Sequence, residues 1–386
     1  TNTLFFVNNA GINTGVAVDT VSDGDYVVAS VNSDDINYAD WYTYFDNREI
    51  EVFQGEEFAL QLNGHLGMAY EEADKTDVSI SKVSIGKVSE TGFQIIDEKT
   101  TDKDGKVKIS FAEPGTYYVS ASGTVKDEVS DWTAAPYDGS VKKTVDCPII
   151  APYCKVTVNS YVEYAKWEGQ GTETSPYIIN SFEDLQKLQT LCNDKGINFS
   201  GKYFKLNDDI TLSSDWVPIG TLKSGQTAAG NGKNINPFSG CFDGNNKTIT
   251  VAENGKPLFG YVREATVKNL NIYGSRIDGY GLINNYAVDY GADGVNKPAT
   301  NPKYAAIIDN CTLKQGSQTL YSGFIGGYAS GVNIVTIRNS EIEKGVTIGY
   351  DKSQNNIGGF AGEFNGYIIN CINHGDVYGV KFVGGI

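Results

Sequence analysis

Few side chains in this sequence belong to the types that carry out catalysis. The two histidines, His65 and His374, lie far apart in the chain, and neither belongs to the HExxH pattern of zinc peptidases. A GxSxG nucleophile motif is also absent. His374 stands in the stretch NHGD, whose composition is typical of a turn. The sequence therefore predicts neither a zinc peptidase nor a histidine-dependent hydrolase.

Carboxylates are the one catalytic class that the sequence supplies in number. Paired acidic residues cleave glycosidic bonds when one acts as the general acid and the other as the nucleophile or base. Asp208 and Asp209 precede a predicted strand and Asp243 begins an Asp-Gly turn, so all three have structural explanations. The remaining candidates are Asp215, Asp278, Asp289 and Asp293. A polysaccharide-cleaving enzyme with a carboxylate pair stays an alternative to a non-catalytic protein, which the sequence favours.

Two acidic turns could supply oxygen ligands to calcium, one at residues 22–25 and one at residues 102–105. Neither matches the EF-hand loop, which needs acidic oxygens at alternate positions and a closing glutamate. Turn formation explains both compositions better. We therefore predict no cofactor, with calcium as the open alternative.

The six cysteines are too few for a disulfide framework in a chain of 386 residues. Cys147 and Cys154 flank a short loop bounded by two prolines, so a local disulfide and two unpaired thiols are equally consistent with the sequence. The other four show no ligand-like spacing, which predicts core packing rather than a metal site. They are Cys192, Cys241, Cys311 and Cys371.

Aromatic clusters supply the candidate ligand-binding residues. Exposed rings can stack on sugars or anchor a protein partner. One cluster is DWYTYF at residues 40–45, which contains Trp41, and its alternation predicts that half of its rings face a core. The other lies in a segment at 278–302 that interrupts a repeat, and it contains Tyr280, Tyr286 and Tyr290. Because inserted loops on repeat proteins often carry binding, we expect the ligand site there.

Composition and charge restrict the class of protein that holds these residues. The length of 386 residues predicts at least two domains, and 44 Gly, 24 Tyr and 17 Phe indicate a mostly β chain. A formal net charge of -16 would repel a polyanion, so we predict no nucleic-acid partner. Apolar runs fall far short of the roughly 20 residues that cross a bilayer, which predicts no direct membrane insertion. The first residues, TNTLF, suit a processed mature end or a cut fragment.

The first part of the chain alternates apolar and polar residues in short runs, a pattern that predicts strands. The stretch TDKDGKVKISF at 101–111 places Asp-Gly between two such runs, which predicts a hairpin. GEEFALQL at 55–62 and TDKDGKVKISFAEPGTYYVSA at 101–121 resemble bacterial Ig-like domains of secreted and surface proteins. We therefore expect a small β region at 1–47, which packs on the next domain or stands beside it, and an Ig-like β-sandwich at 48–160.

A new domain is predicted at 161–386, and it begins with a helix at 181–195. Ser181 can cap the helix N-terminus and Gly196 can end the helix. Four apolar residues fall on one face, Leu185, Leu188, Leu191 and Cys192. We expect this one helix to cover the end of the β structure that follows.

That β structure repeats a glycine-aromatic phrase followed by an asparagine phrase. Examples are PLFGYVREATVKNLNIYG at 257–274 and GGFAGEFNGYIINCINHGDV at 358–377, and later units recur about every 26 to 35 residues. A repeat of this length made of short strands and turns is typical of a solenoid. Glycine and asparagine tolerate the positive φ of tight corners, asparagine amides can hydrogen-bond along a stack, and aromatic and aliphatic residues fill the interior.

These units resemble the GLUG-type repeats of secreted and surface proteins of bacteria, including adhesins and segments of IgA-cleaving metallopeptidases, over about residues 167–386. The resemblance implies a right-handed parallel β-helix (a solenoid), an extracellular location and an adhesive or spacer role. It carries no catalytic residues across, because HExxH is absent. The sequence departs from the family in the insertion at 278–302 and by stopping partway through a unit at 385–386. We expect the natural protein to continue beyond Ile386, and the open end to allow self-association.

The expected whole is an all-β, non-catalytic protein that is secreted or displayed on a bacterial cell surface. It would extend from the surface and adhere to a glycan or protein of a host or microbial surface. A purely structural spacer without a ligand is the second alternative, beside the polysaccharide-cleaving enzyme.

Overall fold

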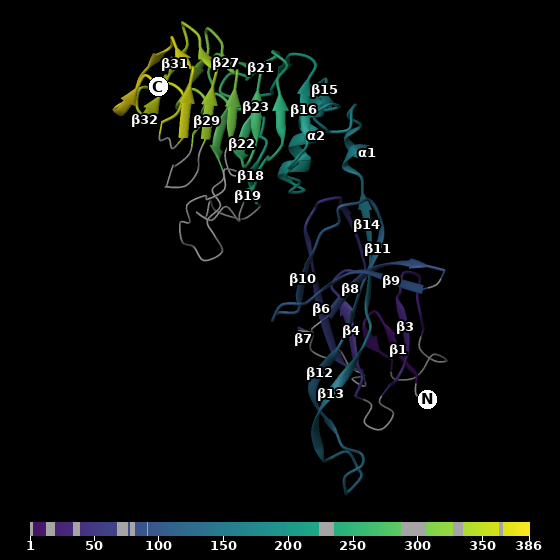
Figure 1. The fold of residues 1–386 in the computed structure, drawn as a ribbon. Coiled ribbons are helices and arrows are strands. Elements are labelled where there is room, and N and C mark those ends of the chain that lie inside the picture. The colour runs from purple at the N-terminus through teal and green to yellow at the C-terminus, as the bar shows by residue number, and fades with distance from the viewer. Residues whose placement is uncertain are drawn as a thin grey trace. The chain divides into compact units, whose positions relative to one another are not determined.

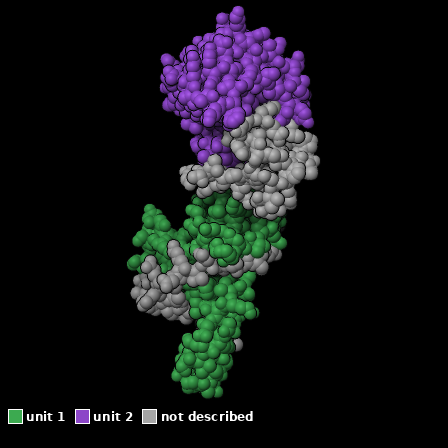
Figure 2. All heavy atoms as spheres, turned by 90° about the vertical axis from the view of Figure 1, so that its left-hand side faces the viewer, with its two compact units in different colours: residues 1–160 green, residues 161–386 purple. Residues whose placement is uncertain are grey.

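The structure is a computed structural model. It describes residues 3–12, 20–33, 39–67, 76–77, 82–90, 92–223, 235–286, 306–326, 335–362 and 366–386. The chain divides into two compact units, Thr1–Ser160 (unit 1) and Tyr161–Ile386 (unit 2), which Figure 2 shows in green and purple. Strands dominate both units (Figure 1), so the predicted all-β class is confirmed.

Unit 1 contains fourteen strands in the described residues. They are β1 (Thr3–Val7), β2 (Ala10–Gly11), β3 (Val27–Val31), β4 (Trp41–Phe45), β5 (Glu49–Phe53), β6 (Phe58–Leu66), β7 (Thr76–Asp77), β8 (Lys82–Ser89), β9 (Gly92–Lys99), β10 (Lys106–Ile109), β11 (Gly115–Ser122), β12 (Thr124–Ser130), β13 (Lys142–Ile150) and β14 (Tyr153–Asn159). They form a six-stranded sheet with the path β10-β6-β4-β13-β12, to which β7 adds, a five-stranded sheet with the order β5-β14-β11-β8-β9, and the small sheet β2-β1-β3.

The main core of unit 1 lies between the six-stranded and the five-stranded sheet. Alternate residues of strands in both sheets point into it, as in the exposed-buried-exposed-buried pattern of β10. Leu60 and Leu62 come from one sheet, Val119 and Val156 from the other, and all four have 0% exposure. Cys147 and Cys154 are buried in the same core, and no disulfide joins them.

Strand β4 is buried on both of its faces. Trp41 and Phe45 point into the main core, whereas Tyr42 and Tyr44 form a second cluster with Phe6 of the small N-terminal sheet. The rings of Phe6 and Tyr42 stack with centroids 3.9 Å apart. The sequence predicted that half of these rings would be core, but the small sheet covers the other half as well.

The Asp-Gly turn of unit 1 does not form the predicted hairpin. The turn is present, because the Gly105 amide donates to the Asp102 carbonyl over 3.1 Å and the Asp102 amide donates to the Lys106 carbonyl over 2.8 Å. However, β9 before it pairs with β8 and β10 after it pairs with β6. The turn therefore carries the chain from one sheet to the other.

Unit 2 contains two helices and twenty-two strands in the described residues. The helices are α1 (Tyr161–Ala165) and α2 (Phe182–Asn193). The strands are β15 (Tyr177–Ile179), β16 (Tyr203–Leu206), β17 (Ile210–Thr211), β18 (Thr221–Leu222), β19 (Ile235–Asn236), β20 (Cys241–Asp243), β21 (Thr248–Thr250), β22 (Phe259–Val262), β23 (Thr266–Lys268), β24 (Asn271–Tyr273), β25 (Ile283–Tyr286), β26 (Ile307–Asp309), β27 (Thr312–Leu313), β28 (Gln318–Thr319), β29 (Val335–Arg338), β30 (Glu341–Ile342), β31 (Thr347–Ile348), β32 (Asn355–Gly358), β33 (Gly366–Ile369), β34 (Ile372–Asn373), β35 (Asp376–Val377) and β36 (Lys381–Gly384).

Strands of successive repeats in unit 2 pair in parallel. A seven-stranded sheet has the order β15-β16-β20-β23-β26-β29-β33, and a six-stranded sheet has the order β17-β21-β24-β27-β30-β34. The smaller sheets are β28-β31-β35, β22-β25, β32-β36 and the antiparallel pair β18-β19. Figure 1 shows the strands of the large sheet side by side in a row from teal to yellow.

The register places equivalent residues of successive repeats beside one another. In the seven-stranded sheet Phe242 pairs with Val267, Val267 with Ile308, and Ile308 with Ile337. All four side chains are buried at 0–1% exposure. Such a column removes apolar surface from water at every level, which stabilises each repeat through its neighbours.

Asparagines occupy the corner after four strands of this sheet, β23, β26, β29 and β33. Asn269, Asn310, Asn339 and Asn370 have φ values of 51–53°, in the left-handed region that asparagine tolerates better than most residues. Their amides also bond along the stack. Asn310 Nδ2 donates to Asn269 Oδ1 over 2.8 Å, and Asn370 Nδ2 donates to Asn339 Oδ1 over 2.9 Å. The corner role and the side-chain bonding predicted for asparagine are both present.

The helix predicted at 181–195 is α2. The Asp184 amide donates to Ser181 Oγ over 3.2 Å, as expected of an N-cap, and the four predicted apolar residues all have 0% exposure. Asn193 ties the helix to the following loop, because its side chain donates to the Pro218 carbonyl and accepts from the Gly220 amide. In Figure 1, α2 lies at the teal end of the strand row. The sequence did not predict the short helix α1 that precedes it.

The aromatic residues of the glycine phrases are not all equivalent. Phe259 pairs with Ile283, and Ile283 bridges Ile325. Ile325 is thus the residue equivalent to Phe259, and Phe324 precedes this position by one residue. Phe324 instead stacks on Phe360 with ring centroids 5.3 Å apart. All three phenylalanines are buried at 0–1% exposure, so each ring belongs to the interior of unit 2.

Candidate functional site

Trp41, a predicted ligand-binding residue, belongs to the core. Its side chain is 7% exposed, and its Nε1 donates to Asp127 Oδ2 over 3.0 Å. A ring packed between sheets has no free face for a ligand. The sequence did not show that Trp41 lies on the face of β4 that packs into the main core, so it was taken for an exposed residue.

The predicted tyrosines of the insertion are only partly described. Tyr280 is half-buried and stacks on Tyr321 with centroids 5.1 Å apart. Tyr286 is the last residue of β25 and pairs with Val262 in the sheet. Tyr290 lies outside the described residues. Tyr280 thus serves packing between neighbouring repeats, and the proposed grouping of three rings stays a prediction.

Four of the candidate catalytic carboxylates bond to neighbouring groups, namely Asp209, Asp215, Asp243 and Asp278. Asp209 Oδ1 accepts from the Thr248 amide over 2.7 Å, and Asp278 forms an ion pair with Lys256. Asp215 is exposed, and a hydrogen bond from Ser213 lowers the pKa of its carboxyl group. Asp289 and Asp293 lie outside the described residues. A glycosidase general acid needs a raised pKa, and the carboxyl pKa shifts present in the described residues are all downward.

The acidic turns considered for calcium hold their carboxylates in turn hydrogen bonds. Asp25 accepts from the Ser22 amide over 2.7 Å and from Asn8 Nδ2 over 2.7 Å. Asp102 accepts from the Asp104 and Lys106 amides, each over 2.9 Å. In the part of the chain that the structure describes, no group of three or more His, Cys, Asp or Glu residues is placed to hold a metal ion.

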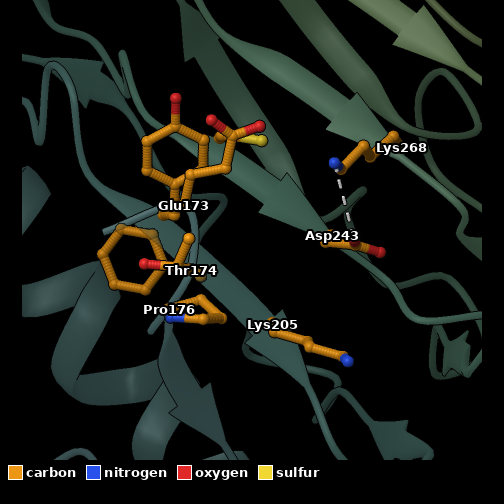
Figure 3. A pocket seen from close by; sticks show the side chains of 9 residues that line it. Glu173, Thr174, Pro176, Lys205, Asp243 and Lys268 are labelled. Atoms are coloured by element: carbon orange, nitrogen blue, oxygen red, sulfur yellow. Dashed lines mark ion pairs between the residues drawn. The ribbon is translucent and has the colours of Figure 1, made fainter. Parts of the chain in front are cut away.

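A pocket of about 220 Å³ opens on the outward face of the seven-stranded sheet (Figure 3). The loop with Glu173, Thr174 and Pro176 forms one wall, and strands β16, β20 and β23 form the floor. The floor residues are Tyr203, Phe204, Lys205, Cys241, Asp243 and Lys268. The pocket exists because the sheet alternates its side chains, so that Phe204 and Phe242 fill the interior while their neighbours face outward.

Charged residues of opposite sign alternate across the floor and beyond it. Lys205 pairs in register with Asp243, and Asp243 with Lys268. The Lys268 ammonium lies 3.6 Å from Asp243 Oδ2, as Figure 3 shows by its dashed line. The same rung continues as Asp309 and Arg338, whose ion pair spans 2.8 Å. We call these five residues the charge rung.

Asp243 and Cys241 are poorly suited to react with a substrate. Asp243 Oδ1 accepts from the Asn245 amide over 2.8 Å and from Asn269 Nδ2 over 3.0 Å, so its carboxylate orders the corner. Burial raises the pKa of the Cys241 thiol, which keeps it protonated and weakly nucleophilic. The pocket offers hydrogen-bonding groups, the Tyr203 side chain and the Lys205 ammonium, a set that suits binding.

The sequence analysis did not find this pocket. Cys241 was expected in the interior, yet it is half-buried and lines the outward face, because the adjacent Phe242 takes the inward position. A usable signal was present, since the charge rung occupies one position in successive repeats. Aligning the repeats by their asparagine corners would have placed Lys268, Asp309 and Arg338 on one line, because each directly precedes its asparagine.

No family model matches this chain, and none of the curated proteins or solved structures matches it. None of the helices in the described residues is long and apolar enough to cross a membrane.

Proposed function

We propose that this chain is a non-catalytic, adhesin-like part of a secreted or surface-displayed bacterial protein. Unit 2 would be a right-handed parallel β-helix of GLUG-type repeats, and unit 1 would contain an Ig-like sandwich. The β-helix extends the molecule away from the surface, and the protein adheres to a glycan or protein of a host or microbial surface.

One observation carries the proposal, namely the parallel register that joins six successive strand pairs from β15 to β33. Each repeat hydrogen-bonds along its backbone to the repeat before and after it. A stack of this kind can be lengthened by adding repeats without a new core design, which suits a spacer that extends a binding element.

The outward face of the stack is consistent with a load-bearing role. The Asp309–Arg338 ion pair and the asparagine corners connect neighbouring repeats side chain to side chain. Asn339 Nδ2 donates to Asp309 Oδ1 over 2.9 Å, so one carboxylate joins both networks. Polar links that span repeats resist sliding of one repeat past the next.

An adhesion experiment tests the proposal. Beads coated with the full chain are incubated with bacterial and epithelial cells, and the same chain is incubated with soluble polysaccharides while new reducing ends are measured. We expect bead retention and no new reducing ends. The paired variant Glu173→Gln, Asp243→Asn is expected to leave retention unchanged within about twofold.

Two results would contradict the proposal. Release of oligosaccharide that stops in the Glu173→Gln, Asp243→Asn variant would establish a polysaccharide-cleaving enzyme instead. Beads that bind no cell surface, although the protein is folded, would leave only the spacer role and remove the adhesive one.

A further inference from the structure

A hairpin of unit 1 presents two exposed aromatic side chains at its tip. Strands β12 and β13 pair over seven residues, from Thr124 with Pro148 to Ser130 with Lys142. Most of their side chains are exposed or half-buried, so the far part of the hairpin stands away from the main core, as Figure 1 shows. The connecting residues 131–141 hold Trp132, 46% exposed, and Tyr137, 68% exposed.

Trp132 differs from the other tryptophans of the chain. Trp41, Trp167 and Trp216 are 7%, 5% and 4% exposed, and all four tryptophans lie within the described residues. Exposing an indole to water forgoes the burial free energy that the other three contribute. Its position at a hairpin tip, in the same short loop as the exposed Tyr137, therefore indicates a contact surface rather than chance exposure.

The Trp132 ring is held by the backbone beneath it. A Cβ added to Gly139 would lie 2.8, 2.9 and 3.1 Å from three consecutive atoms of the six-membered ring. Three nearly equal distances place Gly139 against the face of the ring, because an approach along the ring edge would make them unequal. Gly139, with φ of 77°, thus supports one face of the ring, and the 46% exposure of the side chain implies that the opposite face is open.

Hydrogen bonds order the loop that carries the rings. Asp131 Oδ1 accepts from the Thr133 amide over 3.0 Å and from its hydroxyl over 2.6 Å, and Lys143 lies 3.3 Å away. Asp138 Oδ1 accepts from the Ser140 amide over 2.9 Å. The Tyr137 amide donates to the Ala134 carbonyl over 2.8 Å, with Tyr137 itself at φ 65° in the left-handed region. A bulky residue in that conformation is uncommon and is typical of functional loops.

The size and charge of the tip fit a small neutral ligand. Two aromatic side chains bury roughly 150–250 Å² each, whereas a stable protein interface needs about 800 Å² from each partner. The tip therefore matches one or two sugar rings better than a protein surface. Two acidic residues, Asp131 and Asp138, balance Lys142 and Lys143. This balance gives no preference for a charged glycan.

We propose that the β12–β13 tip binds a neutral glycan, whose apolar ring face stacks on the open face of Trp132 while Tyr137 contacts the adjoining sugar. Pyranose rings present C–H groups on one face, and these pack on an aromatic face while their hydroxyls keep hydrogen bonds to water and to the loop. An ordered loop lowers the conformational entropy lost on binding. This inference deepens the proposed adhesive function by naming a ligand class and a site.

Binding of oligosaccharides to the full chain tests the inference. The probes are neutral oligomers of β-linked glucose, β-linked N-acetylglucosamine, β-linked galactose and α-linked mannose, followed by tryptophan fluorescence and by retention on a printed glycan array. We expect at least one probe to shift the emission of the exposed tryptophan. Trp132→Ala should weaken its binding at least tenfold, and Tyr137→Ala should weaken it about threefold or more.

Matched variants separate this site from a general loss of structure. Tyr153→Ala removes an aromatic side chain of equal exposure, 46%, from β14 of the same unit and should leave binding unchanged. Lys205→Ala alters the pocket of unit 2 and should also leave it unchanged. Gly139→Ala keeps the indole but displaces it, so binding should fall even where Trp132→Ala fails to fold.

Each remaining outcome overturns the inference. These are equal glycan binding by the wild-type and Trp132→Ala chains, a loss caused by Lys205→Ala instead, and binding to none of the probes. Binding to a cell-surface protein that Trp132→Ala abolishes would replace the glycan class by a protein partner. The bead experiment decides the adhesive function separately, because beads that adhere through another surface would keep that function while the tip is excluded.

Discussion

The two units of this chain use strands in different ways. In unit 1, β4 packs on two different clusters. The core contacts of this unit join distant segments of the chain, and no contact is repeated at an equivalent position. In unit 2, the same position of each repeat meets its own equivalent above and below, as Ile308 does between Val267 and Ile337. Unit 1 thus depends on individual contacts, and unit 2 depends on repetition.

The surfaces of the units differ in the same way. The outward face of unit 2 pairs its charges and asparagine amides between repeats. The tip of unit 1 instead leaves Trp132 and Tyr137 exposed on an ordered loop. A repeated surface is suited to extension, and a unique loop is suited to recognition. The comparison implies that changes in one unit should leave the unfolding of the other intact, because each unit has its own core.

The largest effect is expected from Leu188→Asp in α2. Leu188 has 0% exposure, and burying an unpaired carboxylate there should destabilise unit 2 by about 4 kcal/mol or more. Calorimetry should show the unit 2 transition lowered or lost and the unit 1 transition unchanged. If α2 covers the end of the stack, light scattering should also show self-association.

Gln186→Asp is the matched control for this change. It introduces the same charge into the same helix at an exposed position, so both transitions should stay within about 0.5 kcal/mol of the wild-type values. A monomeric Leu188→Asp chain with two unshifted transitions would show that α2 does not hold the stack together.

Truncating one level of the interior column should have the next largest effect. Ile308→Ala removes buried methyl groups between two apolar neighbours, at a cost of about 2 to 5 kcal/mol in unit 2. Val156→Ala in the core of unit 1 should lower only the unit 1 transition. Denaturant unfolding, followed separately in the two units, measures the effects of Ile308→Ala and Val156→Ala. A single merged transition that responds to either change would break the comparison between the units.

The sequence predicted unit 2 better than unit 1 for a physical reason. Because the units repeat, one corner asparagine and one apolar position identify the equivalent residues in the other repeats, so the strands could be predicted locally. The ends of α2 could also be predicted locally, from Ser181 and Gly196. The order of sheets in unit 1 follows from contacts between distant segments, which is why the Asp104-Gly105 turn was taken for a hairpin and Trp41 for an exposed residue. The pocket and the hairpin tip were missed because local patterns do not show which outward-facing side chains gather.

A corner asparagine should contribute a smaller, separable amount. Asn310→Gly keeps the left-handed conformation but removes the 2.8 Å bond to Asn269, so it should cost about 1 kcal/mol. Asn310→Ala also loses the favourable conformation and should cost about 1 kcal/mol more. The difference in unfolding free energy of unit 2 between the two variants measures how much the left-handed backbone conformation contributes. Equal losses in both would show that the conformation adds nothing.

The smallest effect concerns the acid response of unit 2. Burial opposes ionisation of Asp309, but Arg338, Asn339 and Lys268 outweigh it and hold the pKa of that carboxyl group below its usual value. A lowered pKa in the folded state stabilises the protein above the unfolded pKa of about 4, and this contribution is lost as the pH falls through the folded value. The unit 2 midpoint should therefore fall as the pH drops below about 4, and Asp309→Asn should reduce this fall.

The unit 1 transition serves as the internal control for that titration, since Asp309 lies in unit 2. At neutral pH the partly exposed Asp309–Arg338 pair should contribute at most about 1 kcal/mol, because water and salt screen its charges. Both Asp309 oxygens are engaged, however, one by Arg338 and one by Asn339. An asparagine at this position could keep the bond from Asn339 while losing the ion pair. The wild-type and Asp309→Asn chains could show the same acid response of unit 2. The charge rung would then be a consequence of the stacking of the repeats and would not stabilise the stack.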